Sequence, residues 1–265
     1  MTFQQEIRML IFLVLALAIL LITQQPQPSK QETDYIAEYR LDRDMNDLQN
    51  IIDNTTAEGV IVYDPATDTV LGSKNIEKTY SLASLTKIVT ATIAYEKDKT
   101  LLNEIREMMK TSNNEEAQKI AYAFGPDENA QAEYMNNFTK RFGEFTFRNV
   151  SGLDITISTT TDERISGAEA KPMALVGFIK EYYLKYPEIF DQTIVPKGNT
   201  NLIADNLSFL AGGKTGFTLL AGGNLFVSVQ KGLDRQIFII VLNSTEKNRF
   251  VDVQNIARFL VQSSI

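Results

Sequence analysis

The 265-residue sequence contains no histidine and no cysteine, and both absences restrict its chemistry. Without cysteine there are no disulfides, no thiol nucleophile and no thiolate metal ligands. Without histidine a Ser-His-Asp triad cannot form, and a zinc site would have to be built from carboxylates alone, which is unusual. We therefore expect neither a metal nor a cofactor. If the chain is a hydrolase, its general base must be a lysine, a glutamate, an aspartate or a tyrosine.

Clusters of basic residues are also missing. The chain has 26 lysines and arginines against 33 aspartates and glutamates, a net charge of -7. Because phosphate binding needs clustered lysine and arginine, we expect no nucleic-acid partner. A content of 44% hydrophobic and 22% charged residues is that of an ordinary globular protein, and the length allows one sizeable domain with a real core.

One long apolar run follows the polar residues 1–8. Residues 9–22 are all apolar, and as a helix they would span about 21 Å, less than the roughly 30 Å hydrocarbon core of a bilayer. Length alone favours the core of a signal peptide. Against this, Ile7 and Thr23 extend the run, Arg8 can snorkel, and no small-residue cleavage site follows. We expect a cytoplasmic stub at 1–8 and an uncleaved membrane anchor at 9–23, with a cleaved signal peptide as the open alternative.

The rest of the chain predicts a linker at 24–45, with a Gln- and Pro-rich spacer at 24–33, and one domain at 46–265. Hydrophobic spacing predicts helices at 35–52, 101–110, 114–124, 127–141, 172–186 and 250–260. β-branched runs predict strands at 59–63, 69–71, 207–218, 222–230 and 236–242. Strands at both ends with helices between them indicate an α/β (α+β) fold. In it the N-terminal hairpin completes an antiparallel C-terminal sheet, which helices and a helical subdomain flank.

A candidate nucleophile lies at the start of a further predicted helix. In Ser84-Leu85-Thr86-Lys87 a polar approach becomes the apolar run 88–95. Helix positions three apart share a face, so the Lys87 amine would reach the Ser84 hydroxyl. The same spacing recurs between Ser244 and Lys247, where nothing else supports chemistry, so the pattern alone is weak. The absence of histidine leaves Lys87 as the base best placed to serve Ser84.

Two further motifs follow in order, Ser112-Asn113-Asn114 in a polar break between helices and Lys214-Thr215-Gly216 in a strand. Alone, each has a plain structural explanation, either a helix cap or a strand end. Together they match the Ser-x-x-Lys, Ser-x-Asn and Lys-Thr-Gly set of penicillin-recognising serine enzymes. The sequence resembles the serine D-alanyl-D-alanine carboxypeptidases, the low-molecular-mass penicillin-binding proteins. The resemblance covers about residues 57–262 and includes the segment 149–154.

The resemblance implies a β-lactamase/transpeptidase-like fold and a catalytic role for three residues in domain 46–265. Ser84 would attack the carbonyl between the last two residues of a peptide and form an acyl-enzyme, and Lys87 would take its proton. Ser112 would relay a proton to the leaving amine. Lys87 must be neutral to act as a base, and burial beside Lys214 would lower its pKa.

The resemblance also implies a substrate-binding set consisting of Asn114, Lys214, Thr215, Gly216, Phe217 and Arg249. Asn114 would bond the substrate amide, and Lys214 and Thr215 would hold the terminal carboxylate, which Arg249 would also face. Gly216 would leave room for a peptide along the strand edge. The backbone N–H groups of Phe217 and Ser84 would form the oxyanion hole.

Two departures from the family pattern stand out. The segment between Lys87 and Ser112 is shorter than usual, so we expect a substrate-flanking hairpin to be missing and the cleft to be open on that side. The polar stretch 162–169 replaces a direct run into a helix and is a candidate lip over the site.

The sequence therefore predicts a serine carboxypeptidase that trims peptidoglycan stem peptides in cell-wall biogenesis and is acylated by β-lactams. We expect it outside the cytoplasm in the bacterial cell envelope, tethered to the membrane by its N-terminal helix, or secreted if that segment is cleaved. A β-lactamase is one alternative, although it would need an extra carboxylate to activate water. A non-catalytic sensor of cell-wall peptide is another. Carboxypeptidase, endopeptidase and transpeptidase activities share these motifs and stay open.

Overall fold

The computed structural model describes residues 7–9, 11–15 and 30–265, and the chain divides into two compact units, Met1–Asp42 and Arg43–Ile265. In the first unit, residues 7–9 and 11–15 are helical. Among the residues that are described, no helix is both long and apolar enough to cross a membrane. Most of the predicted anchor, residues 10 and 16–23, and the first part of the linker, 24–29, lie outside the described residues.

The long helix α2 (Lys30–Asp53) confirms the predicted helix 35–52 but begins earlier. The predicted spacer is wrong over residues 30–33, because the Lys-Gln-Glu sequence that follows Pro28 favours helix and contains no further breaker. The last turns of α2 belong to the second unit, where Leu48 and Ile52 are fully buried. Gln49 fixes this end by exchanging two hydrogen bonds with the backbone of Ser73.

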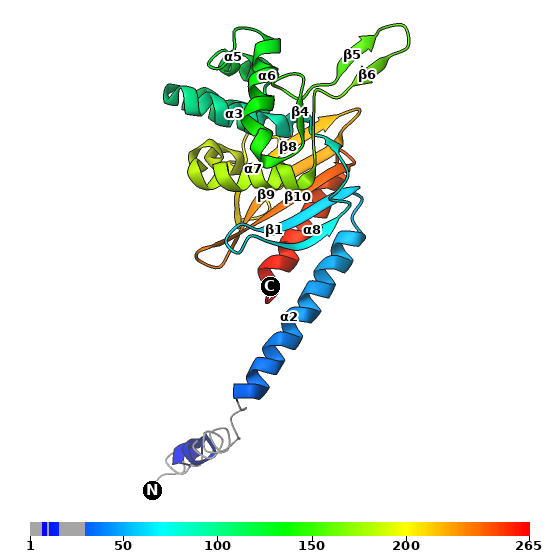
Figure 1. The fold of residues 1–265 in the computed structure, drawn as a ribbon. Coiled ribbons are helices and arrows are strands. Elements are labelled where there is room, and N and C mark those ends of the chain that lie inside the picture. The colour runs from blue at the N-terminus through cyan, green and yellow to red at the C-terminus, as the bar shows by residue number, and fades with distance from the viewer. Residues whose placement is uncertain (1–6, 10, 16–29) are drawn as a thin grey trace. The chain divides into compact units, whose positions relative to one another are not determined.

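An antiparallel sheet of five strands forms the centre of the second unit, in the order β2-β1-β10-β9-β8 (Figure 1). Its strands are β1 (Gly59–Asp64), β2 (Thr69–Lys74), β8 (Leu210–Thr218), β9 (Gly222–Lys231) and β10 (Arg235–Ser244). The N-terminal hairpin joins the C-terminal strands through β1, where Val60 lies opposite Val241. The predicted completion of the sheet is confirmed, and β8 is left as an outer edge.

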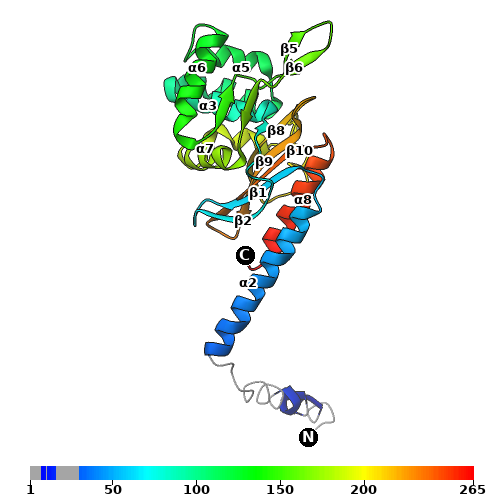
Figure 2. The ribbon, with the colours of Figure 1, turned by 45° about the vertical axis from the view of Figure 1, so that its right-hand side comes forward.

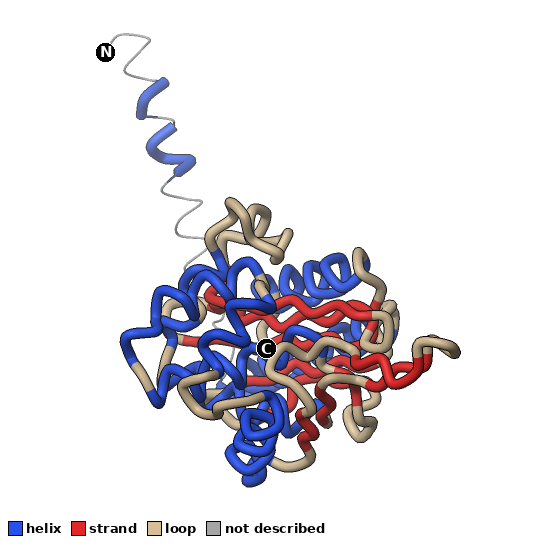
Figure 3. Tube along the Cα trace, turned by 90° about the horizontal axis from the view of Figure 1, so that it is seen from above, coloured by secondary structure: helices blue, strands red, loops and turns tan. Residues whose placement is uncertain are grey.

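Both faces of the sheet are buried. Because strand side chains alternate, Ile237 and Ile239 of β10 enter one core while Phe238 and Ile240 enter the other. The first core includes α8 (Asn248–Gln262), which confirms the predicted closing helix, and the end of α2. Figure 3 shows the strands as one layer with helices on both sides. Burial on both faces explains why β1 and β10 contain continuous apolar runs, residues 60–63 and 237–242.

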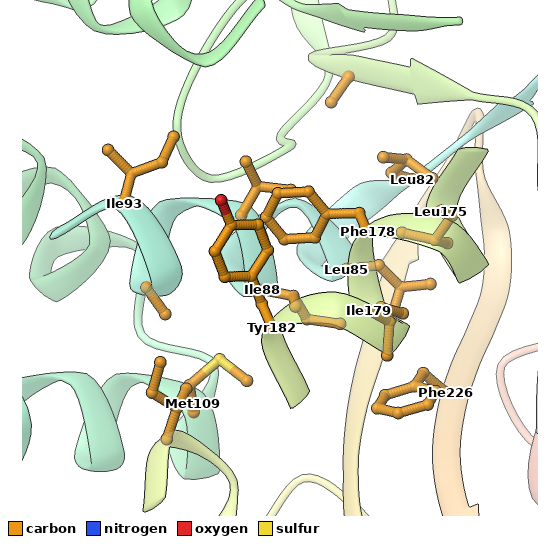
Figure 4. Close-up of a cluster of buried hydrophobic side chains, with 14 of the residues drawn as sticks. Leu82, Leu85, Ile88, Ile93, Met109, Leu175, Phe178, Ile179, Tyr182 and Phe226 are labelled. Atoms are coloured by element: carbon orange, nitrogen blue, oxygen red, sulfur yellow. The ribbon is translucent and has the colours of Figure 1, made fainter. Parts of the chain in front are cut away.

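The second core carries the predicted helical subdomain. Its helices are α3 (Thr86–Lys97), α4 (Leu102–Thr111), α5 (Asn114–Ala121), α6 (Glu128–Thr139) and α7 (Pro172–Lys185). Helix α3 is buried on every side from Thr86 to Tyr95. Figure 4 shows Leu85 and Ile88 among side chains of α7 and β9, including Phe178 and Phe226. The start of α3 is therefore held rigidly, which matters because the candidate nucleophile lies there.

In the described part of the chain, five short strands form two small sheets beside the central one. Strand β7 (Ala168–Ala170) pairs with β3 (Tyr80–Ser81) on one side and with β4 (Phe145–Phe147) on the other. Strands β5 (Ile155–Ser158) and β6 (Glu163–Ile165) form a separate hairpin that projects from the unit (Figures 1 and 2). The stretch 162–169 is therefore not one insert, because its first part belongs to this hairpin and its last part enters the three-stranded sheet.

Candidate active site

Ser84 and Lys87 meet at the junction of the 3₁₀ turn η1 (Ala83–Leu85) and helix α3. The Lys87 Nζ lies 2.7 Å from the Ser84 Oγ, as their spacing predicts. The turn is entered through Ala83, whose φ of 47° is in the left-handed region that alanine rarely adopts. Such a backbone costs about 1–3 kcal/mol, and the packed segments around it hold it in place.

Lys87 is fully buried and surrounded by neutral oxygens. Besides Ser84, its amine donates to Asn114 Oδ1 at 2.7 Å and to the Ser151 carbonyl at 3.1 Å. Burial lowers the pKa of Lys87 to about 7, because none of these partners carries the negative charge that would stabilise the ammonium form. A neutral amine is therefore accessible near neutral pH, and its lone pair can accept the Ser84 proton.

A second serine and lysine pair lies beside the first. Ser112 ends helix α4 in a left-handed conformation with φ 60°, and its Oγ lies 2.8 Å from the Lys214 Nζ. Lys214 also donates to the Thr215 carbonyl at 2.9 Å. Burial lowers the pKa of Lys214 well below its usual value, and the nearby cations Lys87 and Arg249 lower it further. The two buried lysines therefore lie close enough to repel each other when both are charged, as the sequence predicted.

Asn113, rather than Ser112 or Asn114, caps helix α5. Its Oδ1 accepts a hydrogen bond from the Glu116 N–H at 3.1 Å. Because the neighbouring residue does the capping, the Asn114 side chain is free to reach Lys87, and the Ser112 hydroxyl is free to reach Lys214. The helix-cap explanation of this motif is therefore wrong for these two side chains.

Strand β8 passes very close to the candidate nucleophile. A Cβ on Gly216 would lie 2.9 Å from the Leu82 carbonyl oxygen and 3.1 Å from the Ser84 nitrogen. Only glycine allows this approach, and the strand end beyond it exposes Phe217, 43% of whose surface is accessible. On the other side of Gly216, the buried Arg249 donates from Nη1 to its carbonyl oxygen at 2.5 Å. All nine candidate residues thus belong to the elements that meet here.

The segment 149–154 supplies a contact that the sequence did not reveal. The Asn149 Oδ1 accepts hydrogen bonds from the backbone N–H groups of Ser151 and Gly152, and this folds the loop so that the Ser151 carbonyl faces Lys87. The motif was visible in the sequence, but a backbone carbonyl leaves no signal there. Asp154 joins this loop to the end of β8 by accepting from Thr218 Oγ1 at 2.8 Å.

Thr200 is a second residue that the sequence did not indicate. It lies in the loop before β8, and its Oγ1 is 2.6 Å from the Thr215 Oγ1. Nothing in its sequence neighbourhood distinguishes it, because the contact depends on a loop folding back over the strand.

The second Ser-x-x-Lys pattern has a structural role. The Ser244 Oγ donates to Asp252 Oδ2 at 2.8 Å and contacts the Thr56 hydroxyl at 2.7 Å. Its match to the nucleophile motif is a coincidence, as expected. In the part of the chain that is described, no cluster of three or more acidic side chains could hold a metal ion.

The fold is the one found in penicillin-binding proteins and D-alanyl-D-alanine carboxypeptidases. Penicillin-binding protein D2 from Listeria monocytogenes, solved in its ampicillin-bound form, matches with a TM-score of 0.68 and 22% identity over 78% of this chain and 98% of its own. A D-alanyl-D-alanine carboxypeptidase from Francisella tularensis matches with a TM-score of 0.67 and 17% identity over 77% of this chain and 70% of its own.

A peptidoglycan synthesis regulatory factor from Streptococcus pneumoniae has the same fold, with a TM-score of 0.68 and 18% identity over 79% of this chain and 80% of its own. No family model matches the sequence, and no curated protein matches it either. The predicted fold class and the resemblance are confirmed at the level of the fold.

Proposed function

We propose that the chain is a serine D-alanyl-D-alanine carboxypeptidase that removes the terminal D-alanine from peptidoglycan stem peptides. The observation that carries this proposal is the pairing of two serines with two buried lysines, Ser84 with Lys87 and Ser112 with Lys214, in a chain without histidine. A buried lysine with a lowered pKa can do the work of a histidine base. The neighbours that are carboxypeptidases support the substrate class.

The geometry supports the following acylation step. Lys87 takes the Ser84 proton as Oγ attacks the peptide carbonyl, and the new C–O bond gives a tetrahedral oxyanion. Backbone N–H groups of Ser84 and Phe217 would stabilise this charge. The C–N bond then breaks, Ser112 gives its hydroxyl proton to the leaving amine of D-alanine, and the proton held by Lys87 replaces it. Water hydrolyses the resulting ester and restores the Ser84 hydroxyl.

Recognition of the free C-terminus follows from the charges around Lys214. The amine is buried with two other cations nearby, and its described hydrogen-bond partners, Ser112 and Thr215, are neutral. A substrate carboxylate would supply the missing negative charge and stabilise the ammonium form. Thr215 would add a hydroxyl donor, and Arg249 a second cation. A peptide whose terminal carboxylate is blocked should therefore be a poor substrate.

The same site is expected to be acylated by β-lactams. Neighbours with this fold were solved in ampicillin-bound and cefotaxime-bound forms, which supports β-lactam binding here. The described hydrogen-bond partners of Lys87 include no carboxylate that could activate a water for fast deacylation. We therefore expect long-lived labelling by a fluorescent penicillin. Rapid turnover of the drug would instead favour a β-lactamase.

The place of action is also part of the proposal. Stem peptides lie outside the cytoplasmic membrane, and the apolar residues 9–23 would tether the domain there. Fractionation of cells that express the full chain tests this. Recovery in the membrane fraction with the original N-terminus supports the anchor, whereas a shortened protein in the medium supports cleavage.

Release of D-alanine from a pentapeptide tests the activity itself. The wild-type chain should release D-alanine, and Ser84→Ala should not. Ser208→Ala, which changes an exposed serine in the turn before strand β8, is the matched control and should match the wild type. Equal release by wild type and Ser84→Ala would show that Ser84 is not the nucleophile, and no release by either would favour a sensor.

A further inference from the structure

Thr200 connects two of the three motif-bearing elements. Its backbone N–H and its Oγ1 both approach the carbonyl oxygen of Lys110, at 3.2 and 3.3 Å. Lys110 lies in the last turn of α4, just before Ser112. The same Oγ1 is 2.6 Å from the Thr215 Oγ1 on β8. One loop residue thus contacts the element that ends at Ser112 and the strand that carries Lys214.

The distances indicate which of the two contacts of Thr200 Oγ1 is the stronger hydrogen bond. A hydroxyl carries one proton, and good O–H···O bonds are about 2.5–3.0 Å long. The contact with the Lys110 oxygen at 3.3 Å is longer than this, and that oxygen already accepts the Thr200 N–H. The contact with Thr215 at 2.6 Å is within the range. One proton therefore lies between the two threonine oxygens. Without substrate, either hydroxyl can be its donor.

A bound carboxylate would decide the direction of this hydrogen bond. A carboxylate only accepts, so a Thr215 hydroxyl that contacts it must donate. Thr215 then has no proton for Thr200, and Thr200 must donate to Thr215. The result is a chain of two hydroxyls that ends on the substrate, and each bond polarises the next.

We propose that Thr200 is a positioning residue that donates to the Thr215 hydroxyl and so aims it at the terminal carboxylate of the substrate. This inference rests on the proposed carboxypeptidase function. Thr200 is well placed for the task because its main chain is anchored to Lys110, and the next residue is fixed through a hydrogen bond from the Asn201 N–H to Asn199 Oδ1 at 2.8 Å. The Thr200 oxygen is therefore held in position before substrate arrives.

The test compares Thr200→Val, Thr200→Ser and Thr215→Val with the double variant Thr200→Val/Thr215→Val, by D-alanine release. The Thr215 contact exists in the bound ground state, so Thr200→Val should raise KM by roughly threefold to tenfold and leave kcat nearly unchanged. Thr200→Ser keeps the hydroxyl and should restore the wild-type KM. In the Thr215→Val background, Thr200→Val should have no further effect. Thr139→Val, at a buried hydroxyl of helix α6, is the control.

The outcomes separate this inference from the function on which it rests. If the wild type releases D-alanine and Thr200→Val has the same KM as the wild type, the inference is overturned and the proposed function stands. An equal rise in KM on Thr200→Val with and without the Thr215 hydroxyl would also overturn it. Thr200 would then affect KM only through the conformation of the loop. If neither the wild type nor any variant releases D-alanine, the proposed function fails, and the inference fails with it.

Discussion

Lys87 is the residue on which the proposed chemistry depends. Its three hydrogen-bond partners are a hydroxyl, an amide oxygen and a backbone carbonyl, so the pocket satisfies its N–H groups without stabilising its charge. We expected burial and Lys214 together to make this lysine neutral, and burial alone lowers the pKa to about 7. Burial also lowers the pKa of Lys214, and the nearby cations Lys87 and Arg249 lower it further. In the proposed mechanism the two lysines have different tasks, since Lys87 would accept a proton and Lys214 would bind an anion.

The pH dependence of acylation follows from this pKa. Only neutral Lys87 can accept the Ser84 proton, so the acylation rate at saturating β-lactam should rise with pH and level off above about 7. Below that value the rate should fall about tenfold per pH unit. Stopped-flow measurement with a fluorescent penicillin gives the profile. A rise that continues to about pH 10 before it levels off would mean that Lys87 keeps an ordinary pKa.

Asn149 should matter for both stability and rate. Its side chain accepts from Ser151 and Gly152 and donates to the Leu153 carbonyl, so Asn149→Ala leaves several buried groups without partners. We expect a loss of about 1–3 kcal/mol in the free energy of unfolding. Urea denaturation measures it, and Asn54→Ala, at an exposed residue just after α2, is the control. Acylation should slow as well, because the Ser151 carbonyl no longer holds Lys87.

At the scale of elements, the approach of β8 to η1 defines the site. The closeness of Gly216 to the Ser84 nitrogen places the strand edge where a peptide could pair with it, next to the nucleophile. Figure 1 shows β8 beside the helical region at the edge of the sheet. The two elements are far apart in sequence, and hydrogen bonds from the Asn224 side chain of β9 to the carbonyls of Ser81 and Leu82 help to hold the turn beside the sheet.

Gly216→Ala tests this approach. The new Cβ would lie 2.9 Å from the Leu82 oxygen, so strand and turn must separate, and acylation should slow by about 100-fold. Gly177→Ala in helix α7 is the matched control, since its Cβ would make only an ordinary contact of 3.7 Å with Phe142. That variant should react normally and gain about 0.5–1 kcal/mol in stability. Equal rates for both variants would contradict the account.

The sequence allowed much of this arrangement to be predicted. The Ser84 to Lys87 contact follows from local spacing, and the sheet follows from apolar runs and turns. The left-handed Ala83, the Ser151 carbonyl and the Thr200 contact could not be predicted, because each depends on distant segments that pack together. The start of α2 was missed because Pro28 and the glutamines suggested a spacer, whereas the residues after Pro28 favour helix.

At the scale of the whole molecule, one sheet separates two cores with different tasks. One core packs around α3 and α7, and Figure 4 shows Leu85 and Ile88, which follow Ser84 in sequence, among its side chains. The other, with α8 and the end of α2, closes the opposite face of the sheet. Because Leu48 and Ile52 belong to this second core, the end of α2 is part of the folded domain.

Leu48→Ala should therefore destabilise the domain without touching the site. Deleting a fully buried leucine side chain costs about 2–5 kcal/mol. Leu41→Ala, in the exposed part of the same helix, should change the free energy of unfolding by less than about 0.5 kcal/mol. Urea denaturation compares the two, and both variants should be acylated normally while folded. An unchanged stability for Leu48→Ala would mean that α2 does not pack as described.

The central claim is that Ser84 is the nucleophile of an acyl-transfer site with Lys87 as its base. The most direct measurement is intact-protein mass spectrometry after exposure to benzylpenicillin, followed by digestion to locate the adduct. The account predicts one penicilloyl group on the peptide that contains Ser84, and none on Ser84→Ala. An adduct on Ser244 or another residue, or equal modification of wild type and Ser84→Ala, would contradict it.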